Sequence, residues 1–232
     1  MDVILVPGLW LDASSWDDVR PALEAAGHAT HPLTMPGVGA PADEAAAVGM
    51  AEWVAAAVAE IDRLGGPVAL VGHSGGGNVA YGAADARPDR VGKVIFIDTF
   101  PPGDGGIIWD EFPEVDGVIP FPGWDAFEAN EIDDLDAGTR ARFEASAQTV
   151  PPRVPADPIR LSDERRRDVP ATVITCSVPA AQVREFLAKG PAWIAELAAI
   201  RDLDLVDVPA GHWPQFSRPT ELGEAIVRAL AG

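Results

Sequence analysis

Short apolar runs alternate with stretches of helical periodicity along most of this chain. The helical stretches are 14–26, 43–64 and 219–230, with another after Gly76. The apolar runs lack strict alternation, as is typical of strands covered on both faces. Because strand and helix alternate, we predict an α/β fold: an open, mostly parallel, twisted sheet of about six strands with helices on both faces. The predicted strands are 2–6, 29–33, 67–71, 91–97, 171–176 and 203–208.

The regular alternation breaks between the fourth and fifth predicted strands. Residues 100–169 are rich in Pro, Gly and acidic residues, with large apolar side chains between them. A segment of this length is rarely structureless within a compact domain. We therefore predict a core formed by 1–99 and 170–232, with 100–169 as a mostly helical cap over the carboxyl edge of the sheet. Arg165–Arg167, near its end, is interpreted as a solvated surface cluster.

Charge and composition limit the classes of partner. The 232-residue chain carries 36 acidic against 17 basic residues, a formal net charge of −19. Such a surface repels nucleic acid and anionic membranes, so we expect neither as a partner and expect a small-molecule substrate instead. Cys176 is the single cysteine. It lies in an apolar run, which favours a buried thiol. No basic leader or long apolar span is evident, and a cytoplasmic location is the expectation.

A serine stands between glycines where the third predicted strand meets a helix. Gly72-His73-Ser74-Gly75-Gly76 has the form G-x-S-x-G. A sharp strand-to-helix turn strains the residue at its apex and requires small neighbours. It would present the Ser74 hydroxyl at the carboxyl edge, beside the N-terminus of a helix. An ordinary glycine-rich turn or a phosphate loop is the alternative, but the Gly-Lys-Ser/Thr ending of a Walker loop is absent. The context favours a nucleophile.

A serine nucleophile needs a base. The chain has four histidines. His28 and His31 flank the second predicted strand and are interpreted as surface or loop residues. His73 adjoins Ser74, but neighbouring side chains at a sharp turn diverge, so we interpret it as a supporting residue. His212 follows the last predicted strand, and this position brings it to the same edge of the sheet as Ser74. We predict that His212 is the base.

With these motifs the chain resembles the α/β-hydrolases. The resemblance spans the first strand with Pro7-Gly8-Leu9-Trp10, the Ser74 turn, the cap and Gly211-His212-Trp213. It is closest to small cofactor-free esterases and to the hydroxynitrile lyase and salicylate-binding esterase group. The resemblance implies a Ser–acid–His triad and an oxyanion hole formed by the backbone amides of Leu9 and Gly75. Pro7-Gly8 replaces the His-Gly pair usual in the family, while the Leu9 amide is retained.

The acid of the triad departs from the usual family position. Members most often carry it after the strand predicted here at 171–176, but 177–182 contains no acid. Asp98 follows the preceding strand, 91–97, and some haloalkane dehalogenases have their acid at that site, with a similar local sequence. Because those enzymes use an aspartate nucleophile, halide displacement is not expected here. Asp98 is the predicted acid, and a role capping the first turn of the cap is the alternative.

These residues together predict a serine hydrolase for a small to medium apolar ester, thioester or lactone. A cofactor-free lyase of the hydroxynitrile-lyase type and a non-catalytic small-molecule-binding protein remain alternatives. Neither a metal nor an organic cofactor is expected, because no cluster has metal-ligand spacing and no G-x-G-x-x-G follows the first strand. The residues expected to line the substrate pocket are Trp10, His73, Trp109, Trp124 and Trp213.

Overall fold

The computed structural model describes residues 1–232 and contains one six-stranded sheet. Its strand order is β2-β1-β3-β4-β5-β6, and every neighbouring pair is parallel. The sheet is open, with β2 and β6 at its edges. The predicted fold class is therefore confirmed. The strands are β1 (Asp2–Val6), β2 (Ala29–Pro32), β3 (Val68–His73), β4 (Val91–Ile97), β5 (Ala171–Thr175) and β6 (Leu203–Asp207).

The central strands carry apolar side chains on both faces of the sheet. In β1, Ile4 and Val6 join one buried cluster, and Val3 and Leu5 join the other. Strands β3 and β4 divide their residues in the same alternating way. Successive side chains of a strand point to opposite faces, so a strand between two helical layers must be apolar throughout. This explains the continuous apolar runs of the sequence.

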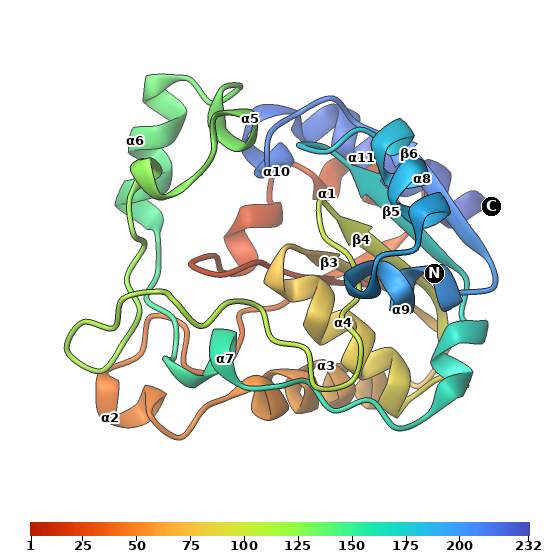
Figure 1. The fold of residues 1–232 in the computed structure, drawn as a ribbon, viewed down its shortest axis with the longest axis horizontal. Coiled ribbons are helices and arrows are strands. Elements are labelled where there is room, and N and C mark those ends of the chain that lie inside the picture. The colour runs from red at the N-terminus through yellow and green to blue at the C-terminus, as the bar shows by residue number, and fades with distance from the viewer.

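Helices cover both faces. One layer contains α3 (Met50–Leu64), α4 (Gly75–Ala86), α8 (Ala180–Lys189) and α9 (Ala195–Ala199), and the other contains η1 (Ala13–Trp16), α1 (Arg20–Ala25) and α11 (Pro219–Ala231) (Figure 1). The remaining short helices are α2 (Ala42–Ala45), η2 (Trp124–Ala126), α5 (Ala129–Ile132), α6 (Ala137–Ser146), α7 (Arg153–Ala156), η3 (Glu164–Asp168), η4 (Ala192–Ile194) and α10 (Pro214–Ser217).

Two predicted helices are interrupted. The stretch 14–26 divides into η1 and α1, because Pro21 lacks an N–H and fits only the first turn of a helix. The stretch 43–64 divides into α2 and α3 at Gly49, which has an extended backbone and donates its N–H to Glu52 at 2.7 Å. A side chain on Gly49 would meet the Asp157 carboxylate, so this break also makes room for a distant segment.

The segment between β4 and β5 adds no strand to the sheet and carries η2, α5, α6, α7 and η3. Part of it packs around a separate apolar cluster that includes Trp124, Leu135 and Phe143, together with Leu11 and Trp213 from the loops of the sheet. Its α5 region also binds the loop after β6, where His212 N–H donates to the Glu131 carbonyl at 2.7 Å. Helices α5 and α6 stand to one side of the sheet (Figure 1).

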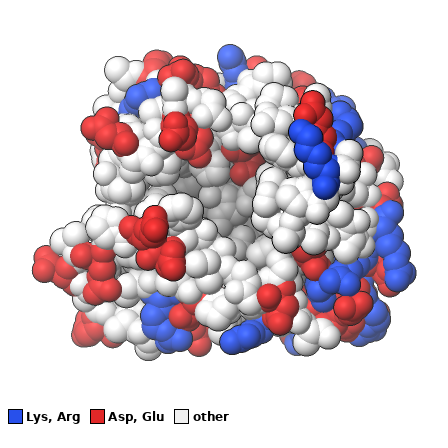
Figure 2. Space-filling model, viewed as in Figure 1, with Lys and Arg blue, Asp and Glu red and all other residues white.

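The face viewed in Figure 2 is hollowed at its centre, and mostly uncharged residues surround the hollow. Acidic side chains gather on the left of this view, over the segment between β4 and β5 and over α2 (Figures 1 and 2). None of the helices has both the length and the apolar character needed to cross a membrane.

Candidate active site

Ser74 occupies the turn between β3 and α4 with a strained backbone. Its φ of 52° and ψ of −127° are rarely adopted by a non-glycine residue. The turn is tight: a Cβ on Gly72 would lie 2.5 Å from the Gly76 carbonyl oxygen, and a Cβ on Gly76 would lie 2.5 Å from those of Val6 and Pro7. Backbone atoms thus occupy the space that side chains would need. This close packing explains why glycine flanks the serine at both positions.

The loop after β1 lies against this turn. A Cβ on Gly8 would be 3.1 Å from the Ser74 Cβ, and the Leu9 side chain lies 3.5 Å from where a Cβ on Gly75 would stand. The Leu9 N–H has no acceptor within the protein. Gly75 is the first residue of α4, so its N–H has no acceptor within that helix. The loop therefore brings two backbone amides, at Leu9 and Gly75, to the vicinity of Ser74.

His212 lies between Ser74 and Asp98. Its Nε2 is 2.9 Å from the Ser74 Oγ, and its Nδ1 is 2.8 Å from the Asp98 Oδ2. The loop that carries it follows β6, Ser74 follows β3 and Asp98 follows β4. Parallel strands deliver all three residues to one edge of the sheet. The structure thus joins the three residues, far apart in sequence, in one hydrogen-bonded chain.

Asp98 has a strained backbone and a fully engaged carboxylate. Its φ is 47°. It accepts four hydrogen bonds: from the N–H groups of Cys176 and Ser177, from the Ser177 hydroxyl, and from His212. Burial alone would raise the pKa of Asp98, but the bonds from His212 and Ser177 outweigh it and leave this pKa below its ordinary value. Asp98 therefore stays ionised at neutral pH beside the imidazole.

His73 is fully buried next to His212, with the centroids of the two rings 5.1 Å apart. Its Nε2 is 2.6 Å from the His212 carbonyl oxygen, to which it donates. Burial, reinforced by the nearby His212, lowers the pKa of His73 to about 3. A neutral ring protonated on Nε2 fits this contact. His73 thus holds the backbone of His212, while His212 N–H is held from the other side by Glu131.

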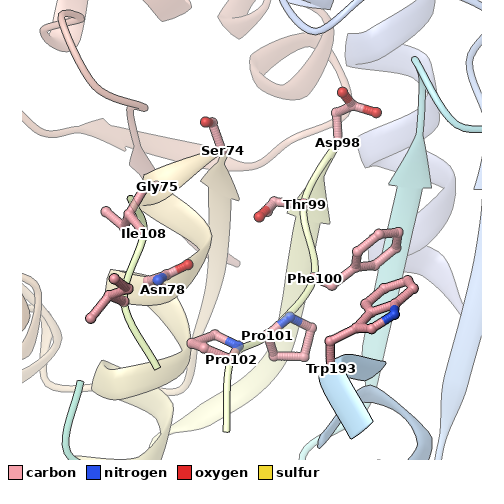
Figure 3. Close-up of a pocket in the computed structure, with 11 residues that line it drawn as sticks. Ser74, Gly75, Asn78, Asp98, Thr99, Phe100, Pro101, Pro102, Ile108 and Trp193 are labelled. Atoms are coloured by element: carbon pink, nitrogen blue, oxygen red, sulfur yellow. The ribbon is translucent and has the colours of Figure 1, made fainter. Parts of the chain in front are cut away.

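A cleft of about 420 Å³ opens beside Ser74 (Figure 3). We call it the Ser74 cleft. One wall is the start of α4, the other is the chain that follows β4, and Trp193 stands at its mouth with 55% of its surface exposed. Its lining residues are Ser74, Gly75, Asn78, Asp98, Thr99, Phe100, Pro101, Pro102, Ile107, Ile108 and Trp193.

The five residues expected to line the pocket do not line this cleft. Trp124 and Trp213 belong to the buried cluster around Phe143. Trp10 packs edge-on against the aromatic rings of Phe112, Phe121 and Phe127. Trp109 is half exposed, and His73 is buried below the His212 loop. Aromatic residues near the motifs were expected to face the site. Most of them instead pack against side chains of the segment between β4 and β5.

Sequence reasoning overlooked two residues at this site, Asn78 and Ser177. Asn78 lies one helical turn after Ser74, and its spacing of four residues was the available signal. Ser177 was considered only as a non-acidic residue after the fifth strand, yet it donates its hydroxyl to Asp98 at 2.7 Å. No group of three or more His, Cys, Asp or Glu side chains is arranged to hold a metal ion.

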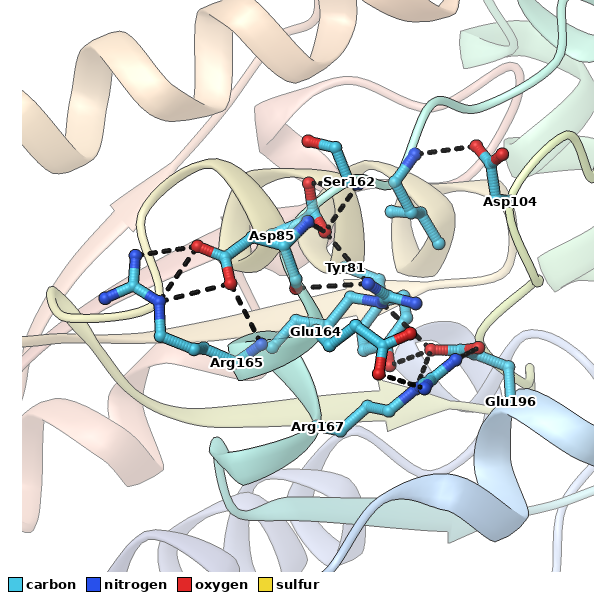
Figure 4. A network of polar contacts seen from close by, with 11 residues as sticks. Tyr81, Asp85, Asp104, Ser162, Glu164, Arg165, Arg167 and Glu196 are labelled. Atoms are coloured by element: carbon cyan, nitrogen blue, oxygen red, sulfur yellow. Dashed lines mark hydrogen bonds and ion pairs between the residues drawn. The ribbon is translucent and has the colours of Figure 1, made fainter.

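A buried polar network supports the other end of α4 (Figure 4). Glu196 accepts from the Tyr81 hydroxyl at 2.7 Å and from Arg166 at 2.9 Å, and it pairs with Arg167. Arg166 also pairs with Asp85 of α4 at 3.2 Å. Burial raises the pKa of Glu196, but the bonds from Arg167, Tyr81 and Arg166 outweigh this effect and lower it to about 2. The interpretation of 165–167 as a solvated cluster is thus wrong for Arg166, which is only 4% exposed. Its buried charge is compensated by the carboxylates of Asp85 and Glu196.

Comparison with known proteins agrees with this architecture. A family model described as "Alpha/beta hydrolase family" matches residues 3–225. The lipase LipV of Mycobacterium tuberculosis is 29% identical over 205 residues, which cover 77% of this chain and 74% of that protein. The esterase PIR7B of Oryza sativa subsp. japonica is 37% identical over 120 residues, which cover 47% of this chain and 43% of that protein.

Solved structures share the fold. An extracellular alpha/beta-hydrolase from a Paenibacillus species has a TM-score of 0.78 at 20% identity, covering 99% of this chain and 98% of that one. A methylesterase from Arabidopsis has a TM-score of 0.76 at 19% identity, covering 100% of this chain and 99% of that one. At these identities the likeness concerns the fold. Since the family model matches nearly the whole chain, this protein belongs to the alpha/beta hydrolase family.

Proposed function

We propose that this protein is a serine hydrolase that cleaves a small to medium apolar carboxylic ester, thioester or lactone through an acyl-enzyme. One observation carries the proposal: the hydrogen-bonded chain from Ser74 Oγ through His212 to Asp98, at 2.9 and 2.8 Å. A serine within hydrogen-bond reach of a base, which a third group orients, is the arrangement that activates a hydroxyl nucleophile. The names of the curated relatives, a lipase and an esterase, support the same class.

In the acylation half, Ser74 Oγ attacks the acyl carbon while His212 Nε2 takes the hydroxyl proton. The carbonyl oxygen becomes an oxyanion, and the amides of Leu9 and Gly75 are the proposed donors to it; one such donor typically contributes ~10²–10³ in turnover. Asp98 accepts a hydrogen bond from the Nδ1–H of His212 and stabilises the imidazolium, without taking the proton itself. His212 then protonates the leaving oxygen or sulfur, and the bond to the acyl carbon breaks.

Deacylation repeats these steps with water as the nucleophile. His212 takes a proton from water, the hydroxide adds to the acyl carbon, and the two amides again stabilise the oxyanion. The proton returns to Ser74 Oγ as the ester bond to the enzyme breaks, and the free acid leaves. The carboxylate of Asp98 stays ionised throughout, as its lowered pKa requires.

We also propose that residues 100–169 act as a cap that bounds the substrate site. Residues 100–102 and 107–108 line the Ser74 cleft, and α5 binds the His212 loop. The apolar part of the cleft lining, which includes Phe100, Ile108 and Trp193, supports an apolar substrate, and the cleft volume suits one of small to medium size. The acidic surface disfavours anionic substrates.

No particular observation favours the lyase or the binding-protein alternative. Neither lysine lines the cleft: Lys93 is buried near the start of β4, at the opposite end of the strand from Asp98, and Lys189 ends α8. A lyase that used only Ser74 and His212 would cleave a cyanohydrin such as mandelonitrile, so this compound belongs in the assay.

The proposal is tested by following acid release from short and medium esters, thioesters and lactones in a pH-stat. Ser74→Ala is expected to lower turnover at least ~10⁴-fold. The exposed Ser146 provides the matched control, since Ser146→Ala should leave turnover unchanged. If the protein hydrolyses no ester but cleaves mandelonitrile, the lyase alternative replaces the proposed hydrolase. Activity that persists in Ser74→Ala would contradict both functions.

A further inference from the structure

Asn78 is a buried polar side chain without a partner. It lies on α4 one turn after Ser74, only 5% of its surface is exposed, and it lines the Ser74 cleft. Neither its amide oxygen nor its amide nitrogen forms a hydrogen bond within the protein, although most buried polar side chains do. Figure 3 shows this amide on the α4 wall of the cleft. An amide so placed is available to a bound molecule.

Thr99 stands on the facing wall. Its methyl group points at α4, since a Cβ on Gly77 would lie 2.5 Å from the Thr99 Cγ2. Its hydroxyl also lacks a hydrogen-bond partner within the protein, and Figure 3 shows this oxygen directed into the space between the two walls. Two polar groups without a hydrogen-bond partner, on two different elements, therefore face the same cleft.

The position of Asn78 on α4 sets its spacing from the nucleophile, Ser74. A helix rises 1.5 Å per residue, so Asn78 lies ~6 Å along α4 from Ser74. Apolar side chains line part of this stretch: Ile108 packs over Gly75, and Phe100 and Pro102 lie on the facing chain. A substrate chain that leaves the nucleophile along this wall thus passes Ile108 before it reaches the Asn78 amide.

The charge of the cleft restricts the ligand. No Lys or Arg lines it, and its single charged group is the Asp98 carboxylate. A carboxylate or phosphate at this position would find no cation and would be repelled by Asp98. An amide both donates and accepts, and a hydroxyl does the same. The pair therefore fits a neutral oxygen function, such as a ketone or an alcohol.

We propose that Asn78 and Thr99 form a polar subsite that makes the enzyme prefer esters carrying a ketone or hydroxyl oxygen ~6 Å from the scissile carbonyl carbon. This proposal rests on the proposed hydrolase function for its kinetic test. Both residues are specificity determinants: they contact the substrate away from the reacting atoms. A plain alkyl chain in the same cleft would leave both polar groups unpaired, which is how such a site rejects it.

The test compares substrates that differ by one oxygen. p-Nitrophenyl 5-oxohexanoate and p-nitrophenyl hexanoate probe the acyl half; 4-oxopentyl acetate and pentyl acetate probe the alcohol half. In one of these pairs the wild type should prefer the ketone by about tenfold in kcat/KM. Asn78→Leu should reduce that ratio to near one, and the isosteric Thr99→Val should reduce it partly. The exposed Gln182 and Thr220 provide the controls, since Gln182→Leu and Thr220→Val should keep the wild-type ratio.

Binding to Ser74→Ala separates this proposal from the hydrolase itself. Titration calorimetry on Ser74→Ala, with and without Asn78→Leu, measures the same four esters uncleaved. If the wild type hydrolyses none of them, the proposed function fails, while a tenfold ratio of Kd that is lost with Asn78→Leu still supports the subsite. Equal binding and turnover of ketone and alkyl esters in both pairs would overturn the subsite, as would a preference that survives in both Asn78→Leu and Thr99→Val. Circular dichroism of each variant confirms that it is folded.

Discussion

Ser177 donates its hydroxyl to the same Asp98 oxygen that faces His212, at 2.7 Å and 2.8 Å respectively. The two donors converge from different strands: Ser177 follows β5, while His212 follows β6. The resemblance to α/β-hydrolases implied an acid after the strand equivalent to β5. Here a serine follows that strand, and the carboxylate reaches His212 from β4 instead. Ser177 thus holds the Asp98 carboxylate through a hydrogen bond.

Because both side chains meet at one Asp98 oxygen, we predict that the carboxylate can be moved from position 98 to position 177. Asp98→Asn should lower kcat by ~10³–10⁴, because an amide cannot stabilise the imidazolium or fix its tautomer. Adding Ser177→Asp to Asp98→Asn should restore at least about tenfold of that loss, since the Ser177 side chain and His212 Nδ1 already meet at the same Asp98 oxygen. Steady-state kinetics on one ester measures both effects.

Ser177→Asp alone is the control for the transplanted acid. It places a second carboxylate next to Asp98 and should lower activity through like-charge repulsion. Equal kcat in Asp98→Asn and in the double variant would show that the carboxylate at 177 cannot reach His212. Wild-type activity in Asp98→Asn would mean that another carboxylate supports the base.

The tight Ser74 turn predicts that alanine at Gly72 lowers the free energy of unfolding far more than alanine at Gly66. Gly72→Ala would place a Cβ 2.5 Å from the Gly76 carbonyl oxygen, a backbone atom that cannot swing away. The variant should lose about 3 kcal/mol of unfolding free energy, the upper end of ordinary overpacking costs. Gly66→Ala is the matched control, because a Cβ there meets nothing within 4 Å. Urea unfolding of the two variants measures the difference; similar midpoints would contradict the close packing of the turn.

His73 predicts a dependence of stability on pH. Burial lowers its folded-state pKa to about 3, from an ordinary 6.5. Between these values the unfolded chain binds a proton that the folded protein does not, so the free energy of unfolding falls as pH drops from 6.5 towards 3. Replacing the ring by an amide, His73→Gln, should remove about 2 kcal/mol of the decline between pH 7 and pH 4.5. Parallel stability curves for the two proteins would show that His73 titrates normally.

The network under α4 predicts unequal costs for two ion pairs. Glu196→Ala removes the partner of buried Arg166 and of Tyr81, and should cost about 3 kcal/mol of unfolding free energy. Glu185 pairs with Lys189 at 3.2 Å, but both side chains are about two-thirds exposed. Glu185→Ala should therefore cost less than ~0.5 kcal/mol. If thermal denaturation finds equal costs, the buried pair does not stabilise α4 as the structure indicates.

Periodicity and motif context predicted the strands along the chain and pointed to Ser74 and His212, while the resemblance to α/β-hydrolases pointed to Asp98. These features depend on local patterns: apolar runs, glycines at a turn, and residues that follow strands. The pocket wall was not predictable in this way, because the direction of Trp10 or Trp124 depends on which distant aromatic residues it meets. Arg166 is a similar case, since its buried partners Asp85 and Glu196 lie 81 and 30 residues away.

The most direct measurement is labelling with a fluorophosphonate, which transfers its phosphonyl group to an activated serine and releases fluoride. Mass spectrometry of the digested protein should find one adduct, on the peptide that contains Ser74, and His212→Ala should abolish it. An unlabelled wild-type protein, an adduct on a different serine, or full labelling of His212→Ala would contradict the claim that His212 activates Ser74.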